Sequence, residues 1–304
     1  MGNSIFVIIN PASGGDEPVL NTLNTVFNEA GWEWDIGVTK QSGDGRQMAQ
    51  EAARSGYDVV AIYGGDGSVM EAATGLLESE IPLAIFPGGT ANVFSKELGI
   101  PQKLLEASKL AVQGPNKVRK VDMGLMNGET YFVLRYATGW EAEMADIADR
   151  DLKDRVGKLA YTVGGVEAIG RNLNAHYRFT LDGQVQECEG VTCMVANTGN
   201  MGIPGVTVNL APDSDVSDGL LDVVVYSHSK KSVWMKVLTF NVARNDDEIN
   251  EDLESLKLRY HWKARKIRIE TDPPLKINLD GEIIGETPSD IEVVSQAVSV
   301  LTPA

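Results

Sequence analysis

Three glycine-rich turns, each directly after an apolar and β-branched run, constrain this chain more than any other feature. The runs cover residues 5–9, 59–63 and 83–86, and the turns that follow them cover 10–15, 64–68 and 87–92. Glycines at the carboxyl ends of parallel strands let the backbone approach a ligand closely. A helix that starts just beyond such a turn favours a bound phosphate. Three such turns predict a nucleotide site.

The first part of the chain alternates strand patterns with helix patterns up to about residue 120. Strands are predicted at 5–9, 34–39, 58–63 and 81–86, and helices at 18–30, 43–55, 69–77, 93–98 and 104–112. Apolar strands that alternate with helices are typical of a parallel sheet covered on both faces. We therefore expect an α/β nucleotide-binding domain over residues 1–120.

Beyond residue 120 strand patterns predominate, which predicts a β-rich, mostly antiparallel second domain over residues 121–304. Strands are predicted at 131–137, 176–181, 191–197, 220–226, 257–262, 266–270 and 275–279, and helices at 141–148, 156–172 and 232–242. The fold class is thus α/β followed by β. Whether the extreme C-terminus packs back on the first domain is left open.

Charge and composition exclude several classes of partner. The net charge of −16 argues against nucleic acid, whose phosphates need a basic surface, and limits any contact with anionic lipid to a local patch. No apolar run approaches the ~18 residues of a transmembrane helix, and no signal peptide is recognisable. Cys188 and Cys193 suggest neither a zinc site nor a disulfide framework, which fits a reducing cytoplasm.

The second glycine-rich turn is the most specific of the three because it carries a carboxylate. Asp66 lies among glycines just before a predicted helix, where it could ligate a Mg²⁺ ion that bridges ATP phosphates. A simple turn is the alternative. Glu71 could support the same site, or its negative charge could stabilise the positive end of the dipole of its own helix. Asn92 could contact a ligand or cap the next helix.

Four motifs in this order resemble the catalytic family of the diacylglycerol kinases, which includes sphingosine, ceramide and bacterial lipid kinases. They are Asn-Pro-x-Ser-Gly-Gly at residue 10, Gly-Gly-Asp-Gly-Ser at 64, Pro-x-Gly-Thr-x-Asn at 87, and Asp-Gly-Glu at 280. The resemblance covers about residues 5–285 and implies ATP bound in a cleft between the two domains. Ser68, Met70 and Val93 depart from the family's frequent residues, which leaves the lipid acceptor open.

The resemblance also implies roles for single residues. The nucleotide would be held by Asn10, Pro11, Ala12, Ser13, Gly14, Thr39, Gly64, Gly65, Asp66, Gly67, Ser68, Glu71, Gly89, Thr90 and Asn92. Asp66 would organise the phosphates and the catalytic metal. Glu282 would accept the proton of the acceptor hydroxyl, with Asp280 as a supporting group or as the competing candidate for the base.

A second, structural Mg²⁺ is implied further along the chain. Its ligands would be a side-chain oxygen of Asp218 and the backbone carbonyl oxygens of Asp215 and Leu220. The alternative is an Asp-Gly turn that enters the strand predicted at 220–226.

The resulting hypothesis is an ATP- and Mg²⁺-dependent kinase that phosphorylates a hydroxyl group of a lipid such as diacylglycerol. Alternatives are a small-molecule kinase of the NAD kinase type and a lipid-binding protein that has lost catalysis. We expect a cytoplasmic protein that meets its lipid at the membrane surface, with peripheral attachment to the inner face left open. The basic residues in 257–268 are either a local lipid contact or the solvated face of a half-buried hairpin.

Overall fold

The computed structural model describes residues 3–14, 17–113, 117–143, 145, 174–199, 211, 214–227 and 259–304. It forms two compact units, Met1–Met123 with Ser295–Ala304, and Gly124–Val294. The chain leaves the first unit within β5 (Lys117–Met126) and returns within β16 (Ser289–Thr302). The helices predicted at 156–172 and 232–242 lie outside the described residues, and the one predicted at 141–148 is described only in part.

The first unit contains a parallel sheet in the order β2-β1-β3-β4, followed by β16. Its strands are β1 (Ser4–Ile9), β2 (Glu33–Val38), β3 (Val59–Gly64) and β4 (Leu83–Pro87). Every residue of β3 and β4 is buried, which requires cover on both faces of the sheet. The last part of β16 joins this sheet where Val300 pairs in parallel with Leu83. The predicted parallel α/β domain is therefore confirmed.

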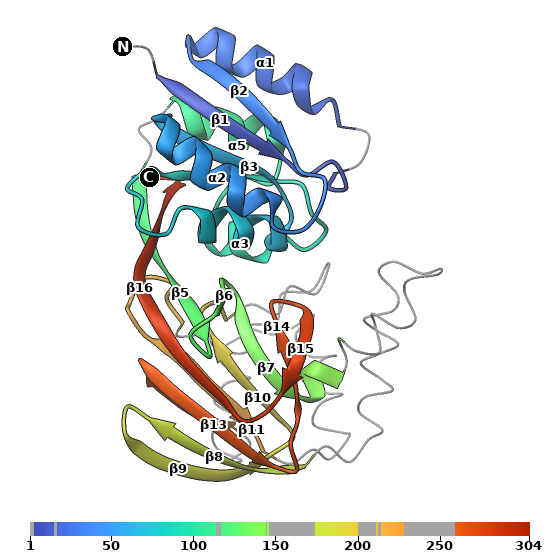
Figure 1. Cartoon of the computed structure of the whole chain (residues 1–304), viewed down its shortest axis with the longest axis vertical. Coiled ribbons are helices and arrows are strands. Elements are labelled where there is room, and N and C mark those ends of the chain that lie inside the picture. Colours follow the sequence, from blue (N-terminus) through green and yellow to red (C-terminus); the bar gives the residue numbers. More distant parts are fainter. Residues whose placement is uncertain are drawn as a thin grey trace, which may run out of the picture. The chain divides into compact units, whose positions relative to one another are not determined.

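Five helices accompany this sheet. They are α1 (Val19–Ala30), α2 (Asp44–Ser55), α3 (Asp66–Gly75), α4 (Val93–Glu97) and α5 (Leu104–Gln113). Helix α1 packs against α5, and α2 packs against α3, with α2 and α3 drawn in front of the strands in Figure 1 and α5 behind them. Helix α1 buries Leu23, Val26 and Phe27, whose spacing places them on one face of the helix.

The second unit contains antiparallel strands in two sheets. One sheet has the order β12-β11-β10-β7-β14-β15, and in the other the first part of β16 is followed by β13, β8 and β9, with β5 and β6 alongside. The strands are β6 (Thr130–Phe132), β7 (Arg135–Gly139), β8 (Ala175–Leu181), β9 (Gln184–Gly190), β10 (Thr192–Ala196), β11 (Leu221–Tyr226), β12 (Arg259–Ala264), β13 (Lys266–Asp272), β14 (Lys276–Leu279) and β15 (Glu282–Glu286).

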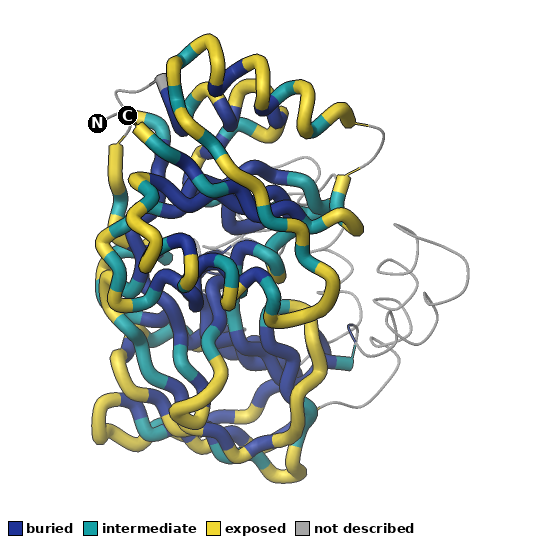
Figure 2. The backbone as a smooth tube through the Cα atoms, turned by 45° about the horizontal axis from the view of Figure 1, so that its top comes forward, coloured by how far each residue is buried: buried dark blue, intermediate teal, exposed yellow. Residues whose placement is uncertain are grey.

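Side chains from both sheets form the core of the second unit. Tyr177 and Phe179 of β8 lie in one buried cluster with Val223 and Val225 of β11. Buried and more exposed residues alternate along β8, as expected when one face of a strand packs on a core. In Figure 2 buried stretches of the tube lie in the interior and exposed stretches on the outside. Strands β3 and β4 are buried throughout, whereas β15 is exposed throughout. The predicted antiparallel β-rich domain is confirmed.

Several elements differ from the prediction. The strand predicted at 131–137 is divided into β6 and β7, and four strands, β5, β9, β15 and β16, were not predicted. The two compact units divide at residues 123–124 and again at 294–295, and the domain bounds 1–120 and 121–304 stay a prediction. Among the described residues, no helix combines the length and apolar character needed to cross a bilayer.

Candidate functional site

The three glycine-rich turns of the first unit meet at one edge of its sheet. Strands β1, β3 and β4 are parallel neighbours, so their carboxyl ends adjoin. The backbone N–H of Gly14 donates to the carbonyl oxygen of Gly88 at 2.6 Å, and the N–H of Gly88 donates to that of Gly64 at 2.9 Å. The turns are therefore hydrogen-bonded to one another and form a single backbone surface.

Packing explains two of the glycines in these turns. Gly14 has a φ of +81°, and a Cβ atom there would lie 2.1 Å from the hydroxyl oxygen of Tyr63. A Cβ atom on Gly89 would lie 2.6 Å from the Cα of Gly65. A larger residue at position 89 would push two turns apart, and one at position 14 would displace the Tyr63 side chain.

Gly67 has no such explanation. It is exposed in the first turn of α3, its φ is outside the positive range, and a Cβ atom there would meet no protein atom within 4 Å. The fold itself would therefore accept alanine at this position. A glycine is useful there if a ligand approaches the backbone closely.

The beginning of α3 can bind an anion. This helix is ten residues long, and no side chain caps its amino terminus at Gly65. The first backbone N–H groups of a helix have no partner within the helix and carry partial positive charge. A phosphate group matches these donors in charge and in geometry.

Asp66 links α3 to α4. Its carboxylate accepts hydrogen bonds from the backbone N–H groups of Val93 at 3.1 Å and Phe94 at 3.0 Å. These are the first residues of α4, so Asp66 supplies the negative charge at the start of that helix. Each carboxylate oxygen has a second lone pair, so these bonds leave room for a metal. The proposed Mg²⁺ role of Asp66 stays a prediction.

Other polar residues of the predicted site hold the turns in place. The Asn10 side chain donates to the hydroxyl oxygen of Ser68 at 2.9 Å and accepts from the N–H of Ala12 at 3.0 Å. Asn92 has a φ of +50°, and its side-chain oxygen accepts the N–H of Gly89 at 2.9 Å. The alternative in which the Asn92 side chain caps α4 is wrong, because that side chain bonds back to the turn.

Glu71 stabilises a different helix from the one predicted. Its carboxylate accepts the N–H groups of Gly43 at 2.8 Å and Gly45 at 3.0 Å and the hydroxyl of Ser42 at 3.1 Å. These donors surround the start of α2, which explains the carboxylate without a ligand. Nothing in the local sequence around Glu71 indicates this contact.

The remaining predicted nucleotide contacts lie at the ends of the same strands. Thr39 follows β2, and its N–H donates to the carbonyl oxygen of Ile9 at 3.0 Å. Ser13 is half-buried, and Pro11, Ala12 and Thr90 are exposed on the first and third turns. The first unit thus gathers all the predicted nucleotide residues at the carboxyl edge of its sheet, and their contacts with a nucleotide stay predictions.

The Asp-Gly-Glu motif forms the tight turn that joins β14 to β15 in the second unit. Asp280 and Gly281 have φ values of +49° and +103°. The Asp280 carboxylate accepts three backbone N–H groups, from Val133 at 2.8 Å, Leu134 at 3.0 Å and Arg135 at 2.8 Å. Loss of solvation raises the pKa of Asp280 to about 6, against the lowering effect of these hydrogen bonds.

Asp280 and Glu282 therefore have different surroundings. Asp280 holds the break between β6 and β7, which explains why the strand predicted at 131–137 is interrupted. Glu282 is exposed at the start of β15. The Asp280 carboxylate is thus taken up by backbone N–H groups, while the role of Glu282 as the base stays a prediction.

Replacing Asp280 with alanine should destabilise the second unit strongly. Three backbone N–H groups would lose their acceptor, at about 1–3 kcal/mol for each buried one, so we expect a loss of roughly 3 kcal/mol or more. Asp182→Ala is a matched control, because Asp182 also has a positive φ and accepts the N–H groups of Arg265 and Lys266, but is exposed. Urea denaturation measures both variants. Equal losses of unfolding free energy would contradict the assigned role of Asp280.

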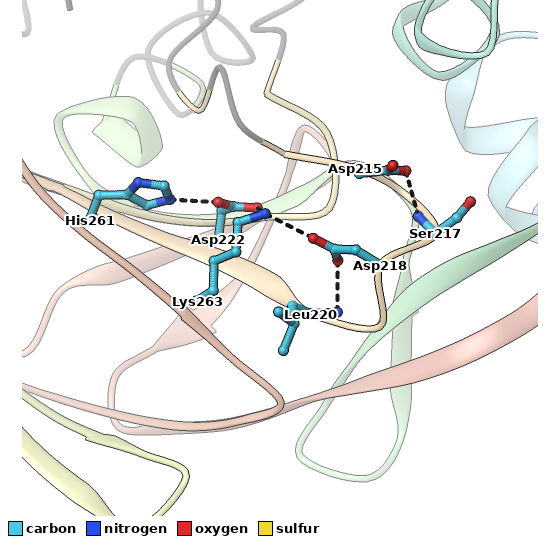
Figure 3. A network of polar contacts seen from close by, with 7 residues as sticks. All are labelled: Asp215, Ser217, Asp218, Leu220, Asp222, His261 and Lys263. Carbon is cyan, nitrogen blue, oxygen red and sulfur yellow. Dashed lines mark hydrogen bonds and ion pairs between the residues drawn. The ribbon is translucent and has the colours of Figure 1, made fainter.

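The residues predicted to hold a structural Mg²⁺ form a turn closed by its own side chains (Figure 3). Asp215 accepts the N–H of Ser217 at 3.0 Å, and Asp218 accepts that of Leu220 at 2.9 Å. The second oxygen of Asp218 lies 2.8 Å from the ammonium nitrogen of Lys263. Among the described residues, no three side chains of His, Cys, Asp or Glu are grouped as a metal site requires. The structural metal stays a prediction.

Some of the basic residues of 257–268 pair with carboxylates of the second unit. Lys263 pairs with Asp218, and Arg268 pairs with Asp290 at 2.8 Å. On the other face of β12, the rings of Tyr260 and Trp262 stack at 5.7 Å, and Trp262 contacts Phe179 of the core. Residues 257 and 258 lie outside the described part of the chain. Strands β12 and β13 belong to different sheets and do not pair with each other, so the predicted hairpin is wrong. The lipid-binding patch stays a prediction.

Comparison with known proteins gives a consistent result over both units. Residues 4–126 match the diacylglycerol kinase catalytic domain, and residues 135–302 match the YegS C-terminal NAD kinase beta sandwich-like domain. A diacylglycerol kinase of Bacillus subtilis (strain 168) is 29% identical over 302 residues, which cover 98% of this chain and 95% of that protein. A diacylglycerol kinase of Staphylococcus carnosus is 28% identical, with 98% and 94% covered.

A solved structure agrees with these sequence matches. The crystal structure of a diacylglycerol kinase from Bacillus anthracis str. Sterne superposes with a TM-score of 0.72 at 27% sequence identity. The superposition covers 99% of this chain and 97% of that one. The likeness therefore extends over both units.

Proposed function

Because the chain belongs to the diacylglycerol kinase catalytic-domain family with a YegS-like C-terminal domain, we propose that it transfers phosphate from ATP to a lipid hydroxyl group. The acceptor would be a lipid such as diacylglycerol, met at the surface of a membrane. The observation that carries the proposal is Gly67, a glycine that neither packing nor backbone strain requires, at the uncapped start of α3. A phosphate that lies against this backbone accounts for both features.

The nucleotide would lie on the backbone surface made by the three glycine-rich turns. The phosphates would approach the backbone at four glycines, Gly14, Gly65, Gly67 and Gly89. The positions of the turns are fixed by hydrogen bonds of three polar side chains, those of Asn10, Ser68 and Asn92. A Mg²⁺ ion bound with ATP would neutralise charge on the phosphates, and the Asp66 carboxylate has the oxygen chemistry to hold it.

Glu282 would act on the acceptor. As the acceptor oxygen forms its bond to the γ-phosphorus of ATP, the bond from that phosphorus to the β-phosphate oxygen breaks and ADP leaves. The hydroxyl proton passes to the Glu282 carboxylate. Asp280 would act through its neighbours, because its carboxylate already binds three backbone N–H groups. Glu282 would be the catalytic base, and Asp280 would fix the turn that carries it.

A panel of acceptors tests the proposed reaction. The protein is incubated with radiolabelled ATP, Mg²⁺ and, in separate assays, diacylglycerol, phosphatidylglycerol, sphingosine or NAD. Label should appear in one of the lipids. Label in NAD alone would instead support a kinase of the NAD kinase type, and label in none of them would support a binding protein without catalysis.

Gly67→Ala should weaken ATP binding while leaving the fold intact. The added methyl group meets no protein atom within 4 Å, and alanine in a helix is favoured over glycine by about 1 kcal/mol. We therefore expect an unchanged or slightly higher melting temperature together with a clear rise in the dissociation constant for ATP, measured by calorimetry. Gly14→Ala is the contrasting variant, because its Cβ atom would meet Tyr63 and should lower the melting temperature. Unaltered ATP affinity in Gly67→Ala would remove the main support for the site.

A further inference from the structure

A lysine ammonium group lies beside the turn for which the family resemblance implies a metal ion. Lys263 of β12 lies 2.8 Å from Oδ2 of Asp218 and 3.7 Å from Oδ2 of Asp222 (Figure 3). The Asp222 side chain is only 2% exposed, so its charge needs a nearby cation. Its other oxygen, Oδ1, lies 2.5 Å from Nε2 of His261.

Strand register fixes this arrangement. Asp222 of β11 and Lys263 of β12 are directly opposite each other in the antiparallel pair. His261 lies two positions from Lys263 along β12, on the same face of the sheet. Asp218 precedes β11 in the turn, within reach of the same ammonium group. The backbone pairing therefore brings the lysine to both carboxylates.

Two of the oxygen atoms expected to bind Mg²⁺ each accept one hydrogen bond, which leaves a lone pair free, so the obstacle to a metal here is the ammonium group and not these bonds. Oδ1 of Asp218 accepts the N–H of Leu220, and the carbonyl oxygen of Asp215 accepts the N–H of Asp218 at 3.3 Å. Mg²⁺ requires a nearly octahedral set of oxygen ligands at about 2.1 Å. An ammonium group 2.8 Å from the principal carboxylate would repel such an ion.

We propose that the Lys263 ammonium group takes the place of a structural divalent cation in this protein. It joins the turn before β11 to the neighbouring strand β12 and neutralises Asp218 and Asp222 together. The second unit then needs no bound metal to fold, and any Mg²⁺ requirement of the protein belongs to the nucleotide.

Thermal unfolding without nucleotide tests this proposal. The full chain is melted in EDTA and in millimolar Mg²⁺, alongside Lys263→Met, Lys263→Arg and the control Lys266→Met. Lys266 is exposed on the next strand, where Asp182 binds its backbone N–H. A resident ion at about 100 times its dissociation constant would raise the melting temperature by several degrees. We expect no such shift in the wild-type chain, in Lys263→Arg or in Lys266→Met.

Lys263→Met should behave differently. Two neighbouring carboxylates lose their cation, so its melting temperature in EDTA should fall by several degrees, and Mg²⁺ should restore part of that loss. A rise of several degrees with Mg²⁺ in the wild-type chain would overturn the proposal. So would a Lys263→Met variant that melts like Lys266→Met in both buffers. If Lys263→Met does not fold, the comparison of the wild-type chain with Lys263→Arg in the two buffers still decides the question.

Discussion

Replacing Asp66 with alanine should reduce ATP turnover to background. The carboxylate is the one acidic group in the glycine-rich turns that lies beside the uncapped start of α3, where we propose that Mg²⁺-bound phosphates lie. Phosphoryl transfer depends mainly on positioning and on neutralising charge, so the loss of this group should affect the chemical step directly. A coupled assay of ADP release with the acceptor lipid measures the effect.

Asp66 also holds the first turn of α4, so loss of activity alone does not identify a metal ligand. The more informative variant is Asp66→Asn, which keeps one oxygen for a backbone N–H but removes the charge. The wild-type protein should bind ATP more tightly in Mg²⁺ than in EDTA. In Asp66→Asn the ratio of the two affinities should fall towards one.

Asp44→Asn provides the matched control for this measurement. Asp44 also accepts two backbone N–H groups, from Lys40 at 2.7 Å and Gln41 at 3.1 Å, at the start of α2. Its substitution should leave the ratio of the two ATP affinities unchanged. If Asp66→Asn weakens binding by the same factor in Mg²⁺ and in EDTA, Asp66 is only an anchor for α4.

Glu282→Gln should lower kcat by about 10²- to 10⁴-fold, which is the usual contribution of a general base. Glutamine keeps the size of the side chain but cannot accept the proton. The KM for ATP should stay near the wild-type value, because the residues that we propose to bind the nucleotide lie on the turns of the first unit. Steady-state kinetics at saturating acceptor measures both constants.

Two further variants make this prediction specific. Glu286→Gln changes an exposed glutamate on the same strand and should leave kcat unchanged. Asp280→Asn should lower stability through its hydrogen bonds to 133–135. If Asp280→Asn abolishes turnover at full stability while Glu282→Gln has no effect, the base is Asp280.

The sequence predicted the first unit well because three of its strands, β1, β3 and β4, are almost entirely apolar runs. The runs before each glycine-rich turn became β1, β3 and β4 within one or two residues. The unpredicted strands are less apolar. In β16, Asp290 and Glu292 alternate with apolar residues, but this alternation stops at the adjacent Val293 and Val294, and Gln296 has a φ of +52°.

The residue types of the candidate site were predictable, but their partners were not. Asp66, Glu71 and Asp280 all bind backbone N–H groups that lie 26 to 147 residues away in the chain. A local pattern shows a carboxylate in a turn and gives no sign of which distant backbone it will hold. Such contacts follow only from the order of the strands, which also brings Lys263 opposite Asp222.

The passage of β16 from one unit to the other has a consequence for synthesis on the ribosome. The place beside β4 in the parallel sheet is filled by residues near 300, although the rest of that sheet is complete by residue 87. A growing chain therefore carries β4 with an unpaired edge while more than two hundred further residues are translated. Unpaired edges invite association with other strands. During that interval the edge of β4 is open to pairing with other strands, and the arrival of β16 closes it.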